Sequence, residues 1–169
     1  MNETQEKYLK IIHALINLPE INYYTGNFGY GLSNYIAKFS LANNTYKISN
    51  EAFILLNNSI PGFNNILLRQ TKQCNAFTYE HPIPINIIRS KLLALQNKTS
   101  AAVQEILNHS DHVTIITKIE NRELSINGLK QRFPIEIEWI PNENTFLRYQ
   151  VVGINLHINS ITMQGAIIR

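Results

Sequence analysis

The chain is poor in cysteine, with Cys74 as its single thiol. One thiol excludes an internal disulfide framework and a four-cysteine zinc site. No apolar run approaches the ~20 residues that a membrane span needs, and the polar, partly acidic start of the chain is unlike a signal peptide. These absences predict a cytoplasmic protein without a membrane partner.

Charged residues are also scarce, at 16% of the chain, where about 25% is usual. Neither a Walker sequence nor a Gly-x-Gly-x-x-Gly sequence occurs, which excludes the standard nucleotide-binding loops. The formal net charge of +3 permits the binding of nucleic acid or phosphate without requiring it. The composition is therefore compatible with an anionic partner but does not identify one.

The 169 residues include 44% hydrophobic side chains, enough for a core without disulfide or metal supports. The chain has no internal repeat and no linker rich in proline, glycine or serine. We therefore expect a single domain over residues 1–169.

Apolar residues at helical spacing predict a first helix that is capped by Thr4 and ends before Pro19. Ser49 is the expected N-cap of the helix over residues 50–57. Thr117 and Glu120 have the pattern of a capping box at the start of the helix over residues 118–124. After the first helix, the complete set of expected helices covers residues 33–39, 50–57, 85–96, 101–108, 118–124 and 144–150.

Strands are expected over residues 76–80, 113–117 and 135–139, followed by a final strand or hairpin through Ile168. Because strands and helices alternate without a regular rhythm, the fold class is predicted to be α+β, with helices packed on a small mixed or antiparallel sheet. Residues 20–31 combine three glycines with four aromatics and are expected to form a loop. Its aromatics either stack on a base or fill the edge of the core.

The segment Glu80-His81-Pro82-Ile83-Pro84 resembles the start of the ββα-metal, or HNH, nuclease motif. This resemblance covers about five residues and implies that Glu80 binds a divalent metal, Mg²⁺ or Mn²⁺ with Zn²⁺ as a further candidate. It also implies that His81 is the general base that activates water against a phosphodiester. The alternative is a structural histidine at the end of a strand, beside prolines that fix a turn.

A second group of metal-binding residue types lies at His109, Asp111 and His112. If helices 85–96 and 101–108 form a hairpin, His81 and this group come to the same end of it. The predicted metal ligands are therefore Glu80, His109, Asp111 and His112. The alternative interpretation is a polar turn between a helix and a strand.

Basic residues outnumber acidic ones in the stretch 69–98, which indicates a phosphate-binding face. The predicted nucleic-acid contacts are Arg69, Lys72, Arg89, Lys91 and Lys98. Arg148 and Tyr149, further along the chain, either contact phosphate or pack over the core.

The sequence thus favours a metal-dependent nucleic-acid endonuclease, of the kind found in restriction, phage-defence or mobile-element systems. The alternative is a non-enzymatic module that binds nucleic acid or regulates another protein. Nucleic acid is the expected partner in most of these hypotheses, and a homodimer is compatible with all of them.

Overall fold

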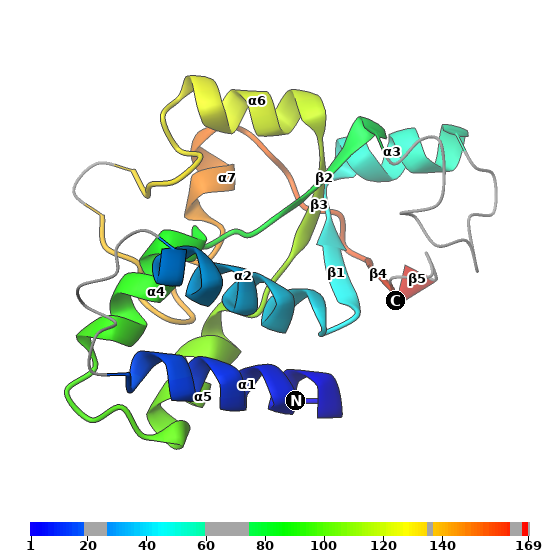
Figure 1. Cartoon of the computed structure of the whole chain (residues 1–169). Helices are drawn as coiled ribbons and strands as arrows, with labels where there is room; N and C mark the ends of the chain where they lie inside the picture. Colours follow the sequence, from blue (N-terminus) through cyan, green and yellow to red (C-terminus); the bar gives the residue numbers. More distant parts are fainter. Residues whose placement is uncertain (19–26, 60–74, 135–136, 163–166, 169) are drawn as a thin grey trace. The chain divides into compact units, whose positions relative to one another are not determined.

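The computed structural model describes residues 1–18, 27–59, 75–134, 137–162 and 167–168, and they form an α+β fold, as predicted (Figure 1). Backbone contacts divide the chain into two compact units. Unit 1 comprises residues 1–43, 83–111 and 138–145. Unit 2 comprises residues 44–82, 112–137 and 146–169. Each unit is assembled from three separate stretches of the sequence.

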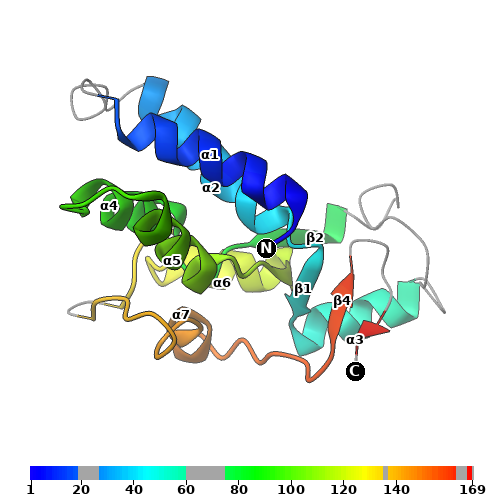
Figure 2. The ribbon, with the colours of Figure 1, turned by 90° about the horizontal axis from the view of Figure 1, so that it is seen from below.

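In its described residues, unit 1 contains four helices, α1 (Glu3–Ile16), α2 (Asn27–Leu41), α4 (Ile85–Ala94) and α5 (Ser100–Ser110). Helix α1 packs against α2 and α5, and α4 also contacts both α2 and α5 (Figure 2). The predicted pair of consecutive helices over 85–108 is confirmed, with Thr99 as the N-cap of the second. The buried side chains between the helices include Leu9, Ile12, Ile36, Phe39, Ile88, Leu92, Val103 and Leu107.

The starts of α1 and α2 differ from the prediction. Asn2 rather than Thr4 caps α1, because the Asn2 side chain accepts a hydrogen bond from the Gln5 amide at 3.0 Å while Gln5 accepts one from the Asn2 amide at 3.1 Å. The loop expected over 20–31 is wrong for residues 27–31, which belong to α2. Burial of later residues of α2 outweighs the low helix propensity of its glycines. Residues 20–26 lie outside the described residues.

Unit 2 contains the sheet, with strands β1 (Thr45–Ile48), β2 (Phe77–Glu80), β3 (Thr114–Thr117), β4 (Ser160–Thr162) and β5 (Ile167–Ile168). Their order is β2-β3-β1-β4-β5. The pair β1 and β3 is parallel, and the other neighbours are antiparallel, so the predicted mixed sheet is confirmed. All four residues of β3 are buried.

The strand expected at 135–139 is absent from its described part, because residues 137–140 have no regular structure. Asn144 explains the difference. Its side chain accepts a hydrogen bond from the Ile140 amide and donates one to the Glu138 carbonyl, both at 2.9 Å. These bonds satisfy backbone groups that would otherwise pair with a neighbouring strand. Residues 135 and 136 lie outside the described residues.

Helices α3 (Asn50–Ser59), α6 (Lys118–Ile126) and α7 (Leu147–Val151) complete unit 2. Helix α7 is shorter than the predicted 144–150 and begins later. Helices α3 and α6 follow β1 and β3 directly, and since these strands are parallel, both helices begin at the same edge of the sheet. The turn proposed at residues 61–62 lies outside the part of the chain that is described.

The predicted caps of α3 and α6 are confirmed, and one carboxylate joins them. Ser49 accepts a hydrogen bond from the Ala52 amide at 3.1 Å, and Thr117 with Glu120 forms a complete capping box. Glu120 Oε2 also accepts from the Ser49 hydroxyl and from the Thr117 amide, both at 2.7 Å. The buried Glu120 side chain therefore holds the starts of two neighbouring helices together.

We expect Glu120→Ala to lower the free energy of unfolding by roughly 1–3 kcal/mol, because it leaves buried donors on Ser49 and Thr117 without an acceptor. The matched control is Glu123→Ala, which removes an exposed carboxylate from the same helix. Urea unfolding measures both variants. Equal stability of the two variants would contradict this role for Glu120.

Candidate functional site

Glu80 is the last residue of β2 and pairs in register with Thr114 of β3. Its Oε1 accepts a hydrogen bond from Arg148 Nη2 at 2.8 Å, and its Oε2 accepts one from the Tyr149 hydroxyl at 2.6 Å. The side chain is only 12% exposed. Both carboxylate oxygens are therefore engaged by side chains of α7.

Arg148 is completely buried and donates to several backbone carbonyls besides Glu80. Its Nε donates to the Pro82 carbonyl at 2.8 Å, and its Nη2 donates to the carbonyl of His81. Its Nη1 donates to the carbonyls of Leu129 and Lys130. The guanidinium thus joins α7, the segment after β2 and the segment after α6.

Burial controls the protonation of this cluster. It raises the pKa of the Glu80 carboxyl above the usual 4.5, and the neighbouring Arg148 and Tyr149 offset this only in part. Burial also raises the pKa of the Tyr149 phenol well above its ordinary value, and the adjacent Glu80 carboxyl raises it further. Tyr149 therefore keeps its proton and remains a hydrogen-bond donor to Glu80.

His81 follows Glu80 and lies in the same buried environment. Burial, with a smaller contribution from Arg148, lowers the pKa of the imidazole from 6.5 to about 4. Its Nδ1 is buried and has no hydrogen-bond partner within the described part of the chain. The ring is neutral at neutral pH, as a general base must be, but so low a pKa makes it a weak base.

The other predicted metal ligands, His109, Asp111 and His112, contact neighbouring side chains. In unit 1, His109 Nδ1 lies 3.0 Å from Asn142 Oδ1, and Asp111 Oδ2 accepts from Gln5 at 3.3 Å and Asn43 at 3.2 Å. In unit 2, the ring centroid of His112 lies 5.8 Å from that of Phe146. Among the described residues, no group of three or more His, Cys, Asp and Glu side chains is placed to hold a metal ion.

The described members of the predicted basic face belong to unit 1 and are held by local partners. Lys91 pairs with Glu138 at 2.6 Å and lies 5.8 Å from the centre of the Trp139 ring. Lys98 donates to the Ile16 carbonyl at 3.0 Å, and Arg89 donates to the Ser33 hydroxyl at 3.4 Å. Arg69 and Lys72 lie outside the described residues.

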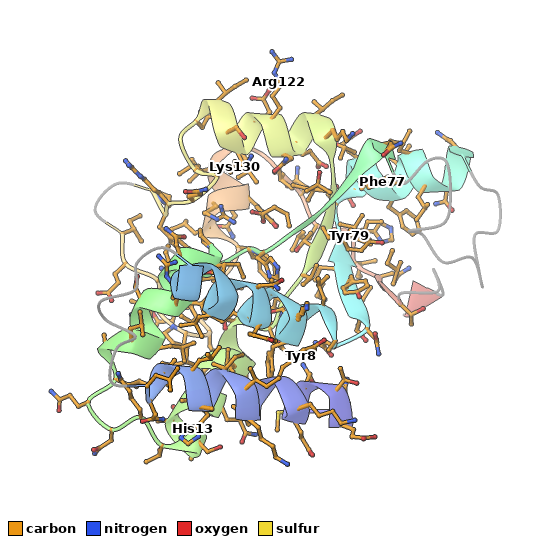
Figure 3. All side chains as sticks on the ribbon, in the orientation of Figure 1. Tyr8, His13, Phe77, Tyr79, Arg122 and Lys130 are labelled. Carbon is orange, nitrogen blue, oxygen red and sulfur yellow. The ribbon has the colours of Figure 1, made fainter. Side chains whose placement is uncertain are left out.

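The basic excess belongs to unit 2, which has nine Lys and Arg against five Asp and Glu, whereas unit 1 has six against seven. Four of its cations are exposed within the stretch 118–132 and have no ion pair with any described carboxylate. We name them the basic surface: Lys118, Arg122, Lys130 and Arg132. Figure 3 shows Arg122 pointing outward from α6.

Local pattern explains how the basic surface is displayed. On α6, Glu120 and Leu124 are buried one turn apart, so Lys118 and Arg122 lie on the opposite, exposed side. Beyond the helix, the buried Leu129 and Phe133 anchor the segment between them. The spacing of these apolar residues in the sequence is a signal for the display of the four cations, but the larger local excess of basic residues lies at 69–98.

Comparisons with family models, with curated protein sequences and with solved structures return no match. Within the described residues, no helix is both long and apolar enough to cross a membrane. The geometry of the site is therefore the basis for any statement about function.

We expect Arg148→Met to lower the free energy of unfolding by about 3–5 kcal/mol, because it leaves the Glu80 carboxyl buried without its cation. The double variant Glu80→Gln with Arg148→Met should recover part of this loss, as contacting residues are not additive. Glu3→Gln, in an exposed pair with Lys7, is the control for loss of an ordinary surface ion pair. Fully additive losses in urea unfolding would disprove the coupling.

The lowered pKa of His81 predicts a pH dependence of stability. Between pH 6.5 and about 4 the unfolded chain binds a proton at this residue that the folded chain does not, so stability should fall on acidification through this window. The loss attributable to His81 is up to about 3 kcal/mol. The raised pKa of Glu80 acts in the opposite sense, since the folded state then holds its proton more readily.

Comparison with His81→Gln separates the two effects, because Glu80 is present in both proteins. Urea unfolding across this pH range should show that the wild type loses more stability than the variant as the pH falls. Parallel pH profiles would show that the imidazole does not resist protonation in the fold.

Proposed function

We propose that this chain binds nucleic acid through the basic surface of unit 2, and that Glu80 and His81 serve the fold. The observation that carries the proposal is the set of four exposed cations in the stretch 118–132, none of which forms an ion pair with a described carboxylate. Lysine and arginine side chains displayed in this way bind phosphates and release the counterions of the strand.

The position of Lys118 and Arg122 supports an anionic partner. Lys118 is the first residue of α6, where the helix carries a partial positive charge that disfavours cations. Lys118 and Arg122 are also four residues apart, so the two like charges face each other along the helix. Neither side chain therefore stabilises α6, whereas a bound phosphate would relieve both effects.

The surroundings of Glu80 and His81 are poorly suited to the cleavage of nucleic acid, which favours a function in binding. A metal would have to compete with Arg148 and Tyr149 for the two Glu80 oxygens. An imidazole with a pKa of about 4 is poorly matched to proton abstraction at neutral pH. The nuclease hypothesis stays a prediction, which a cleavage assay with Mg²⁺ or Mn²⁺ can test.

Exposed apolar side chains on α6 support a second candidate function, the docking of another protein. Ile119 is 76% exposed and Ile126 is 64% exposed, and they lie two turns apart on the side that also carries Arg122. In a nucleic-acid complex these side chains would contact sugars and bases. Replacing both isoleucines by serine separates the two functions. It should weaken the docking of a protein but largely preserve nucleic-acid binding, which depends chiefly on the cations.

Binding of short single- and double-stranded DNA and RNA, followed by fluorescence anisotropy, tests the proposal. With four phosphate contacts, affinity should fall roughly 50- to 150-fold between about 50 and 200 mM salt. Replacing the four cations of the basic surface by glutamine should abolish most of this salt dependence, and each single replacement should reduce the slope by about 1.

The matched control replaces Arg89, Lys91 and Lys98 by glutamine and should leave the salt dependence unchanged. Binding that ignores salt, or no binding at low salt, would refute the proposal. Incubation of the same strands with Mg²⁺ or Mn²⁺ adds the test of cleavage. Degradation that disappears in His81→Gln, while the fold persists, would support the nuclease hypothesis instead.

A further inference from the structure

A groove of about 660 Å³ runs along the outer side of α3 in unit 2. Its described lining consists of Asn50, Glu51, Phe53, Ile54, Asn57, Asn58 and His157. The α3 residues recur at spacings of three, four and seven, so they form one stripe of the helix. None of the cations of the basic surface lines this groove.

An aromatic pair forms one wall of the groove. The rings of Phe53 and His157 are stacked with centroids 3.8 Å apart and an interplanar angle of 15°. The backbone of His157 is held by a hydrogen bond from its amide to the Ile48 carbonyl at 2.8 Å. Both side chains are half-buried, so the pair is fixed in place and still partly accessible.

A hydrogen bond determines which nitrogen of His157 is a donor. Nδ1 accepts from the Asn159 amide at 3.1 Å, so the proton of the neutral ring resides on Nε2. The amides of Asn50, Asn57 and Asn58 add further donors and acceptors to the groove, and Glu51 adds an acceptor. These groups match the mixed donor and acceptor edges of a nucleobase.

The charge of the groove distinguishes among the parts of a nucleotide. Among the described residues that line it there is no lysine or arginine, and Glu51 would repel a phosphate. A flat, neutral heteroaromatic ring fits such a site, because it can stack on an aromatic pair and bond with amides at its edge. Phosphates are better served by the basic surface.

We propose that the groove on α3 binds a nucleobase of a single strand, stacked on the Phe53–His157 pair. This inference rests on the proposed function, which supplies the strand, and it adds the class of ligand: an unpaired base. Helices α3 and α6 begin at the same edge of the sheet and are joined through Glu120. The groove and part of the basic surface are therefore carried by two linked helices of one unit.

NMR of the ring signals of His157 tests the groove directly. Adenosine monophosphate should shift these signals, because a stacked base places a ring current over the imidazole. Ribose phosphate, which has the same charge but no base, should leave them unchanged. Absence of a shift with adenosine monophosphate, or equal shifts with both compounds, would overturn the inference.

Oligonucleotide binding gives the second arm. Loss of one stacked base weakens binding roughly 5- to 150-fold, so Phe53→Leu should lower the affinity for a single strand by this factor. The variant should bind an abasic strand like the wild type and keep the salt dependence. Circular dichroism and thermal melting confirm that it is folded, and His157→Gln provides an independent variant of the same wall.

The two proposals fail in distinguishable ways. If the basic surface governs binding, yet Phe53→Leu and the abasic strand behave like their controls, the groove inference fails and the proposed function stands. If His157 responds to the base but strands bind without dependence on salt or on the basic surface, the proposed function fails and the base site stands.

Discussion

The buried ion pair between Arg148 and Glu80 is the interaction on which the structure of unit 2 depends. A completely buried guanidinium must place all its donors, and Arg148 does so on Glu80 and on four backbone carbonyls. Three separate stretches of chain are joined at this point. Tyr149 donates a hydrogen bond to the other Glu80 oxygen, and it belongs to an apolar cluster with Ile116 of β3 and Leu124 of α6. The local match to a nuclease motif therefore coincides with a place where the fold itself needs an acid.

Several features with a local cause were predictable from the sequence, although the cap of α1 at Asn2 was not. The capping box of Thr117 and Glu120, the Ser49 cap and the strands β2 and β3 depend on neighbouring residues and were correctly predicted. Features with a distant cause were not. Glu80 and Arg148 are separated by 68 positions. The bonds of Asn144 span only four and six positions, but they too were not predicted, because alternation alone had suggested a strand there. Single-sequence patterns contain no information on distant contacts, so the partners that Glu80 has in the fold could not be predicted.

Charge and aromatic character are distributed unevenly within unit 2. The basic surface lies on α6 and the segment that follows, whereas the groove on α3 has an aromatic wall and, in the described part of its lining, Glu51 as its single charged residue. Glu120 couples the two helices because one carboxylate serves both of their starts. In the proposed function, this arrangement would separate the task of holding a strand, which needs cations, from the task of holding a base, which needs a flat ring and amides.

Backbone amide NMR signals recorded during titration with a short single-stranded oligonucleotide test the central claim most directly. The account predicts that the perturbed amides cluster in residues 118–132 and along α3, while those of residues 80–82 keep their positions. Perturbations centred on residues 80–82, or on residues 89–98 of unit 1, would contradict it and return the function to the sites that the sequence first suggested.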